Sequence, residues 1–193
     1  MTDTDLKKKD IRKDFIKRRS GLAPDKKALY DTVICDRITS MDEYNDAGLV
    51  LVYASYNGEV DTKELIKRCI KDGKSVACPR CRIEDGVPAL DFYRIGSWDD
   101  LNEGYKGIPE PGADEDKKVS GHEIKDALII VPMVGYDKSG NRLGYGKGFY
   151  DRFLAANKNA KSIGLAYSIQ ECDELPVDEY DVRPDMIINE TGV

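Results

Sequence analysis

The stretch Gly48-Leu49-Val50-Leu51-Val52-Tyr53-Ala54 is an uninterrupted apolar run. A strand without polar alternation is typical of a parallel sheet that is covered on both faces. A second run of this kind, Ala127 to Val131, is followed by Pro132. Together the two runs predict the centre of a sheet that lies between two layers of helices.

Outward from these strands, helical and extended patterns alternate along the chain. Apolar spacing and end signals predict helices over Asp5–Ser20, from Pro24 past Ile38, over 61–73 and over 149–157. Further strands are expected over 75–78, 82–83, 90–93, 162–167 and 183–188, and an Asp85-Gly86 turn joins the second and third of these. Residues 96–120 and 135–148 are predicted to be loops. The alternation predicts an α/β three-layer sandwich with a mostly parallel central sheet, formed by one domain over residues 1–193.

Composition excludes several classes of protein. The chain has 193 residues, 30 Lys and Arg against 36 Asp and Glu, and a net charge of −6. No apolar run approaches the roughly 20 residues of a membrane helix, and the N-terminus lacks the apolar core of a signal peptide. The overall acidity argues against a nucleic-acid partner. We therefore expect a cytoplasmic protein that binds neither membranes nor nucleic acids.

Cysteine usage fits a reduced compartment. Five cysteines are present, at positions 35, 69, 78, 81 and 172. Cys78 and Cys81 form a C-x-x-C motif, but a zinc site needs about four ligands, and the only histidine is His122. A redox pair should open a helix, whereas this one is expected to close the strand that begins at Ser75. We interpret both thiols as structural.

The densest unusual segment runs from Asn141 to Arg152. Gly144, Gly146 and Gly148 occupy alternate positions immediately before the last expected helix. Open backbone amides and a helix N-terminus favour a bound anion, and Arg142 and Lys147 add positive charge. The segment matches neither the P-loop nor the dinucleotide fingerprint. It predicts a phosphate-binding loop, with a flexible glycine-rich hairpin as the alternative.

Carboxylates near this loop are candidates for metal binding. Asp151 lies on the first turn of the expected helix, where it could hold Mg²⁺ against phosphate oxygens. The alternative is a favourable charge at a helix start. The segment 175–185 offers several further carboxylates, and spacing alone does not choose among them.

Taken together, these residues resemble the 5-formyltetrahydrofolate cyclo-ligase family over nearly the whole chain. The strongest part of the resemblance runs from Val131 through Asp137 and from Gly140 through Asp151. Support comes from segments 8–12, 59–62, 107–111 and 163–167, from Gln170, and from Asp181 before Arg183-Pro184-Asp185.

The resemblance implies a fold similar to that of sugar-phosphate isomerases and coenzyme A transferases. It also implies an ATP- and Mg²⁺-dependent conversion of 5-formyltetrahydrofolate, with or without a polyglutamate tail, to 5,10-methenyltetrahydrofolate with release of ADP and phosphate. This chemistry uses a nucleophile within the substrate itself. The absence of a Ser-His-Asp or Cys-His arrangement is therefore no argument against it.

Residue roles follow from the same resemblance. It implies Arg142 and Lys147 as catalytic cations and Asp151 and Asp181 as the magnesium ligands. It implies ATP contacts from Lys8, Lys9, Asp10, Ile11, Arg12, Arg142, Leu143, Gly144, Tyr145, Gly146, Lys147, Gly148, Phe149 and Tyr150. It implies folate contacts from Ala54, Glu59, Tyr145, Gly146, Lys147, Gly148, Phe149 and Tyr150.

Two positions depart from the family's pattern, and two other functions stay open. Tyr180 stands where His or Asn is frequent, and Met133 where Gly is frequent. One alternative is a non-catalytic nucleotide or folate binder on the same scaffold. The other is a phospho-sugar isomerase, because fold alone does not give function. For the cyclo-ligase we expect a monomer.

Overall fold

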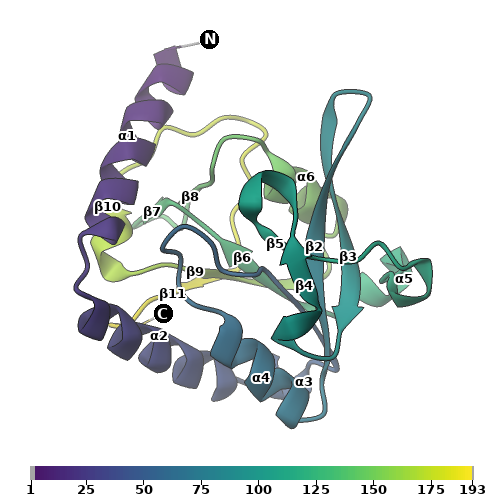
Figure 1. The fold of residues 1–193 in the computed structure, drawn as a ribbon. Helices are drawn as coiled ribbons and strands as arrows, with labels where there is room; N and C mark the ends of the chain where they lie inside the picture. The colour runs from purple at the N-terminus through teal and green to yellow at the C-terminus, as the bar shows by residue number, and fades with distance from the viewer. Residues whose placement is uncertain (1–2, 193) are drawn as a thin grey trace.

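The computed structural model describes residues 3–192 and places the first apolar run in the middle of a six-stranded sheet (Figure 1). The strand order is β11-β9-β6-β1-β2-β3. The strands are β1 (Leu49–Val52), β2 (Ser75–Glu84), β3 (Val87–Ile95), β6 (Leu128–Pro132), β9 (Lys161–Leu165) and β11 (Met186–Ile188). All neighbours are parallel except β2 and β3, which form an antiparallel hairpin. The predicted mostly parallel sheet is confirmed.

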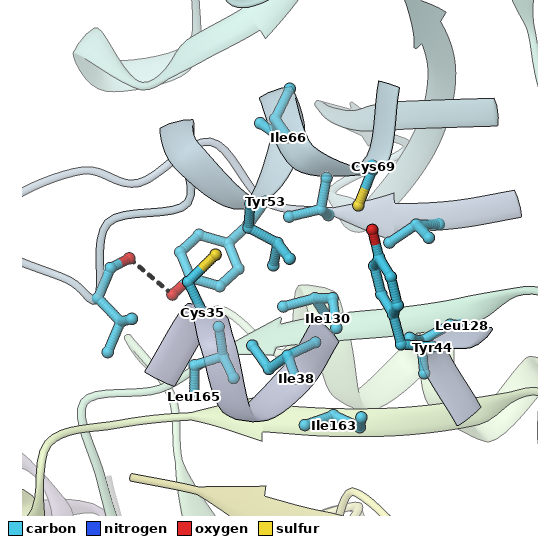
Figure 2. Close-up of a cluster of buried hydrophobic side chains, with 14 of the residues drawn as sticks. Cys35, Ile38, Tyr44, Tyr53, Ile66, Cys69, Leu128, Ile130, Ile163 and Leu165 are labelled. Atoms are coloured by element: carbon cyan, nitrogen blue, oxygen red, sulfur yellow. Dashed lines mark hydrogen bonds between the residues drawn. The ribbon is translucent and has the colours of Figure 1, made fainter. Parts of the chain in front are cut away.

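Each face of the sheet carries its own apolar cluster. Val50 and Val52 of β1 face one cluster, and Leu49 and Leu51 face the other. Side chains alternate along a strand, so a fully apolar strand supplies both faces. Figure 2 shows the first cluster, where Cys35 and Cys69 pack among branched aliphatic side chains.

Helices cover both faces, as the alternating pattern predicts. Helices α2 and α4 pack over the first cluster and α6 over the second, which gives the three layers. Their bounds are α1 (Asp3–Ser20), α2 (Pro24–Thr39), α3 (Asp42–Asp46), α4 (Lys63–Lys71), α5 (Gly121–Ile124) and α6 (Phe149–Ala156). Helix α1 lies beside the sheet rather than on it, and its Phe15 packs against Val134, Leu143 and Leu175.

The expected loop over 135–148 contains a short hairpin, which corrects the sequence-based prediction. Strands β7 (Gly135–Asp137) and β8 (Arg142–Leu143) pair, and β10 (Glu171–Cys172) completes a three-stranded sheet. The buried Asp137 carboxylate accepts hydrogen bonds from the amides of Ser139, Asn141 and Leu175. The bonds to Ser139 and Asn141 stabilise the hairpin turn, and the bond to Leu175 ties the hairpin to a distant segment, which no local pattern of residues predicts.

The prediction of a surface loop over 96–120 is also wrong in part. Strands β4 (Leu101–Glu103) and β5 (Pro109–Pro111) pair within it. Glu110 is buried, and its carboxylate accepts a hydrogen bond from the Cys81 amide at 3.0 Å. A tertiary contact therefore orders a segment whose composition is typical of a loop.

Strand β2 is longer than predicted. It continues past Cys78 to Glu84 and turns through Asp85 and Gly86 into β3. The C-x-x-C motif therefore lies inside a strand and does not close one. All five thiols are free, and burial raises the pKa of Cys78 and of Cys81 to about 12, so both are poor nucleophiles. This agrees with the structural interpretation.

Candidate functional site

The loops after β1, β6 and β9 converge at the carboxyl edge of the sheet, where ligands bind in parallel α/β folds. The Tyr167 hydroxyl, after β9, donates to the backbone carbonyl of Glu59, after β1, at 3.2 Å. The Gln170 amide donates to the carbonyl of Val134, after β6, at 2.7 Å. The three loops therefore meet at this edge of the sheet.

The glycine-rich loop connects β8 to α6. Gly146 and Gly148 have φ angles of +86° and +70°, which side chains rarely adopt. A Cβ on Gly146 would lie 3.1 Å from the guanidinium carbon of Arg12, so glycine also allows this close approach. The first turn of α6 leaves backbone amides without intrahelical partners. The side chain of Lys147 is exposed and has no hydrogen-bond or ion-pair partner among residues 3–192.

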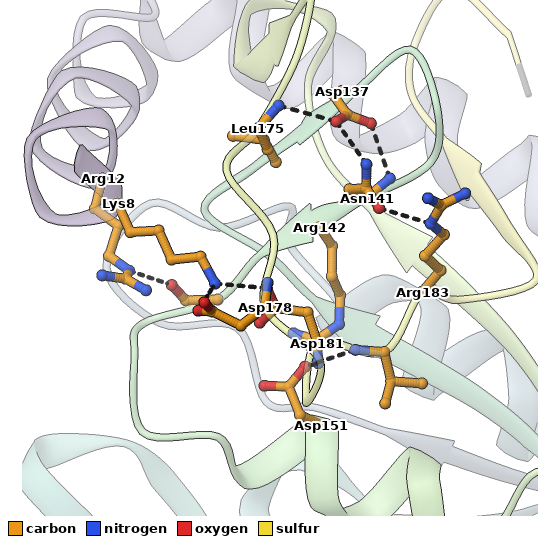
Figure 3. Close-up of polar contacts among 12 residues, drawn as sticks. Lys8, Arg12, Asp137, Asn141, Arg142, Asp151, Leu175, Asp178, Asp181 and Arg183 are labelled. Atoms are coloured by element: carbon orange, nitrogen blue, oxygen red, sulfur yellow. Dashed lines mark hydrogen bonds and ion pairs between the residues drawn. The ribbon is translucent and has the colours of Figure 1, made fainter. Parts of the chain in front are cut away.

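Helix α1 reaches this loop with two cations. Lys8 Nζ lies 2.6 Å from Asp178 Oδ2 and 2.5 Å from Asp181 Oδ2, and Arg12 Nε donates to the Gly144 carbonyl at 2.7 Å (Figure 3). Burial alone would lower the pKa of Lys8, but the two carboxylates outweigh it and raise that pKa. Two cations four residues apart thus share one helix face, as their spacing predicts.

Arg142 points into the protein rather than into the open loop. Its Nη2 lies 2.6 Å from Asp151 Oδ1, and its side chain is almost fully buried. Its Nε has no partner among the described residues, and burial lowers its pKa. The same Asp151 oxygen accepts from the Val182 amide at 3.2 Å. Arg142 therefore contacts a predicted magnesium ligand.

The two predicted metal ligands lie close together. Val182, whose amide binds Asp151, directly follows Asp181 in the chain. No group of three or more metal-binding side chains occurs within residues 3–192. Mg²⁺ is usually bound by one or two carboxylates plus substrate phosphate oxygens, so two suffice. The donor set fits Mg²⁺ bound together with a nucleotide.

Glu59, in the loop after β1, is buried among polar groups. Its carboxylate is 7% exposed and accepts from the Tyr56 amide at 2.8 Å. Burial raises its pKa to about 7, while the Tyr56 amide, the Arg19 charge and the Tyr145 hydroxyl oppose that rise. The Tyr150 hydroxyl is buried without a partner among the described residues. Both groups have unused hydrogen-bonding capacity.

The remaining predicted site residues have varied surroundings. Ala54 is buried at the end of β1. The hydroxyl of Tyr145 reaches inward to Arg19 although the residue is 43% exposed. Phe149 meets the ring of Tyr105 edge-on, with centroids 5.9 Å apart. Ile11 and Leu143 pack in the cluster around Phe15. Lys9 and Asp10 are exposed, and neither makes a described contact with the two carboxylates that bind Lys8.

Sequence reasoning missed two polar residues that organise the site. Asp178 binds Lys8 together with Asp181, and nothing in its spacing distinguishes it from its acidic neighbours. Arg19 is buried and contacts both Tyr145 and the loop that carries Glu59. Arg19 follows Lys8 by eleven residues, about three helical turns, so helical periodicity could have placed it on the same face.

An apolar groove of about 650 Å³ lies elsewhere, between β3, α5 and α6. None of the residues predicted for the site lines it. The site cluster at the carboxyl edge therefore lies outside this groove.

The fold and these groups define an α/β protein with a glycine-rich, cation-bearing loop and a buried carboxylate at the carboxyl edge of a mostly parallel sheet. The chain belongs to the 5-formyltetrahydrofolate cyclo-ligase family, whose model matches residues 4–190. Members of this family are ligases, and the chain is an enzyme of that class.

Individual relatives agree with this membership. The chain is 27% identical to the mouse 5-formyltetrahydrofolate cyclo-ligase, over 95% of this chain and 93% of that one. It is 30% identical to the Haemophilus influenzae enzyme of the same name, over 91% and 94%. A solved structure of 5,10-methenyltetrahydrofolate synthetase from Aquifex aeolicus superposes with a TM-score of 0.81 and 30% identity, covering 96% of this chain and 90% of that one.

No helix within residues 3–192 is long and apolar enough to cross a membrane.

Proposed function

We propose that this enzyme converts 5-formyltetrahydrofolate to 5,10-methenyltetrahydrofolate with ATP and Mg²⁺. One observation carries the proposal: Lys8 and Arg12 of α1 contact Asp181 and the glycine-rich loop, beside Asp151. Cations, open amides and two carboxylates then lie together, as transfer of a phosphoryl group from a nucleotide requires. Membership in the cyclo-ligase family supports the choice of substrate.

The proposed reaction needs no protein nucleophile. The formyl oxygen attacks the γ-phosphorus of ATP, and the bond from that phosphorus to the β,γ-bridging oxygen breaks to release ADP. The N10 lone pair of the folate then attacks the formyl carbon. Phosphate leaves with the former formyl oxygen, and N10 loses its proton. The protein has to align the reactants and neutralise charge.

Different groups of the chain would serve each part of this task. The Lys147 ammonium, which has no partner in the described part of the chain, and the first amides of α6 can bind phosphate oxygens. Arg12 covers Gly146 and adds a second cation. Arg142 binds Asp151 and fixes the orientation of that carboxylate. Bound Mg²⁺ would supply Lewis-acid neutralisation of the phosphates, held by Asp151 and Asp181.

Glu59 would recognise the pterin end of the folate. Its carboxylate can accept two hydrogen bonds from an aminopyrimidine edge. Its buried position supports recognition of a flat polar ring, because the Tyr150 hydroxyl in the same interior region also has no partner within the described residues. The folate and the nucleotide would then approach the glycine-rich loop from two sides.

A spectrophotometric assay tests the proposal. Purified protein is mixed with 5-formyltetrahydrofolate, ATP and Mg²⁺, and the near-ultraviolet absorption of the methenyl product is followed. We expect the band to grow only in the complete mixture, and omission of ATP is the control. Calorimetric binding of both ligands without any band would favour the non-catalytic binder. Failure to bind either ligand would reject the proposal.

A further inference from the structure

Arg19 is a buried arginine that the proposed chemistry does not use. It lies near the end of α1 and is only 2% exposed. Its Nη2 donates to the backbone carbonyl of Asn57 at 2.7 Å and to the hydroxyl of Tyr145 at 2.8 Å. Its Nη1 donates to the Met133 carbonyl at 3.4 Å. One guanidinium thus joins the loop after β1, the end of β6 and the glycine-rich loop.

Packing alone does not explain an arginine at this position. Its Nε is buried and has no hydrogen-bond partner among residues 3–192. A buried charge is expensive for stability, and an apolar side chain of similar volume often serves folding equally well. The interactions that the guanidinium does make therefore point to a role in the site.

Those interactions fix the segment that presents Glu59. Asn57 and Gly58 have φ angles of +51° and +75°, a left-handed turn that glycine and asparagine adopt more readily than other residues. The hydrogen bond from Arg19 to the Asn57 carbonyl fixes this turn to α1. The Tyr145 hydroxyl, which accepts from Arg19, also lies close enough to the Glu59 carboxylate for the two groups to influence each other's pKa.

We propose that Arg19 is a positioning residue that links the glycine-rich loop to the turn before Glu59 and holds that carboxylate in place for folate, beside a positive charge. The inference rests on the proposed function. It assigns Arg19 an action through Tyr145 and Asn57 rather than contact with the substrate.

The surroundings of Glu59 make Arg19 its main source of positive charge. The groups that face it from other elements are phenols: Tyr53 at the end of β1, Tyr145 in the glycine-rich loop and Tyr150 of α6. Tyr167 bonds to its backbone carbonyl and to Asp31. Burial holds the pKa of these phenols above the ordinary value, so they stay neutral near pH 7.

The sign of the pH effect follows from these charges. Burial raises the Glu59 pKa to about 7, and Arg19 opposes that rise. Folate that donates hydrogen bonds to the carboxylate binds when the pH is above this pKa, and the binding is lost as the pH falls through the pKa. Removal of the positive charge raises the Glu59 pKa further, so the loss of binding moves to higher pH.

Three variants test the inference by calorimetric titration with 5-formyltetrahydrofolate, without ATP, from pH 6 to pH 9. Arg19→Met removes the charge, Arg19→Lys retains it but shortens the reach, and Arg18→Met is the control. Arg18 is the adjacent arginine, which pairs with Asp14 at 2.5 Å on the exposed face of α1. Circular dichroism confirms that each variant is folded.

For Arg19→Met we expect folate binding to weaken about tenfold at pH 7, because one charge-assisted hydrogen bond is lost. We also expect the pH midpoint of folate binding to rise. For Arg19→Lys we expect weaker folate binding with a pH midpoint near that of the wild type. This variant tests the effect of the charge even if the methionine variant does not fold. Arg18→Met should match the wild type. Unchanged affinity and midpoint in the folded Arg19 variants would overturn the inference, whereas absence of folate binding by the wild type would overturn the proposed function instead.

Discussion

At the scale of single residues, the site depends on a few charges whose neighbours differ sharply. Lys8 is buried and binds Asp178 and Asp181 together, while the Lys147 ammonium has no partner among the described residues. A buried lysine with two carboxylates is held in place, and an exposed one is free to bind a ligand. The two lysines should therefore respond differently to mutation.

Asp181→Asn should raise the Mg²⁺ concentration needed for half-maximal activity. An amide keeps the shape of the side chain but loses the charge that a hard divalent cation prefers. Activity is measured across a magnesium titration at saturating ATP. Asp178→Asn is the matched control, because Asp178 shares Lys8 but is not a predicted metal ligand. An unaltered titration for Asp181→Asn would assign the metal to another carboxylate.

Lys147→Ala should raise the KM for ATP about tenfold, because one charge-assisted contact with phosphate is lost. Its free energy of unfolding should stay within about 0.5 kcal/mol of the wild type, since the ammonium has no partner among residues 3–192. Steady-state kinetics and urea unfolding give the two quantities. Equal KM values for the variant and the wild type would remove Lys147 from the nucleotide site.

At the scale of elements, the site depends on how closely α1 packs against β7. Gly135 lies beneath Phe15, and a Cβ there would come within 2.3 Å of the Phe15 ring. Protein interiors are close-packed, so such an overlap forces the helix or the strand to move. Because α1 also carries Lys8, Arg12 and Arg19, this contact contributes to the position of three site cations.

Gly135→Ala should lower the free energy of unfolding by about 1–3 kcal/mol, the usual effect of overpacking a core. It should also weaken ATP binding, because α1 can no longer hold Lys8 and Arg12 in their present positions. Urea unfolding and calorimetric titration with ATP measure the two effects. Gly112→Ala is the control, since a Cβ there would meet nothing within 4 Å. Wild-type values of both quantities for Gly135→Ala would show that α1 tolerates the added methyl group.

At the scale of the whole molecule, Asp137 connects parts of the chain that are far apart in sequence. Its buried carboxylate binds the β7–β8 turn through Ser139 and Asn141 and the distant Leu175 amide. Burial alone would raise its pKa, but the hydrogen bonds from Asn141, Leu175 and Ser139 outweigh it, and the pKa is lowered. Its stabilising effect is therefore present above its ordinary pKa and is lost as the pH falls through the lower folded value.

Asp137→Asn should reduce the free energy of unfolding by about 2 kcal/mol at pH 7, because a neutral amide accepts these bonds more weakly. Below about pH 4 the difference from the wild type should narrow, since the wild-type carboxyl group protonates as well. Urea unfolding is measured from pH 3 to pH 7. A difference that stays constant over this range would show that the charge of Asp137 does not stabilise the fold.

The sequence-based predictions were accurate where the deciding interactions lie close together in the chain, and less accurate where they join distant segments. Strand β1 and helices α1, α2, α4 and α6 were predicted because apolar spacing and end signals act within one element. The extension of β2 to Glu84 and the ordering of Glu110 were missed, since strand pairing and a buried carboxylate depend on distant segments. In the site, the pairing of Lys8 with Arg12 on one face of α1 was predictable, whereas the role of Asp178 was not.

By itself, the sequence determined the order of helices and strands, the mostly parallel sheet and the glycine-rich loop before α6, because each depends on residues close together in the chain. Only the tertiary structure decided that Arg142 faces Asp151, that Lys8 joins Asp178 to Asp181, and that Arg19 reaches Tyr145. Contacts of this kind depend on the angles at which helices pack and on the paths of loops. Those are set by the packing of the whole core, which no local pattern of residues encodes.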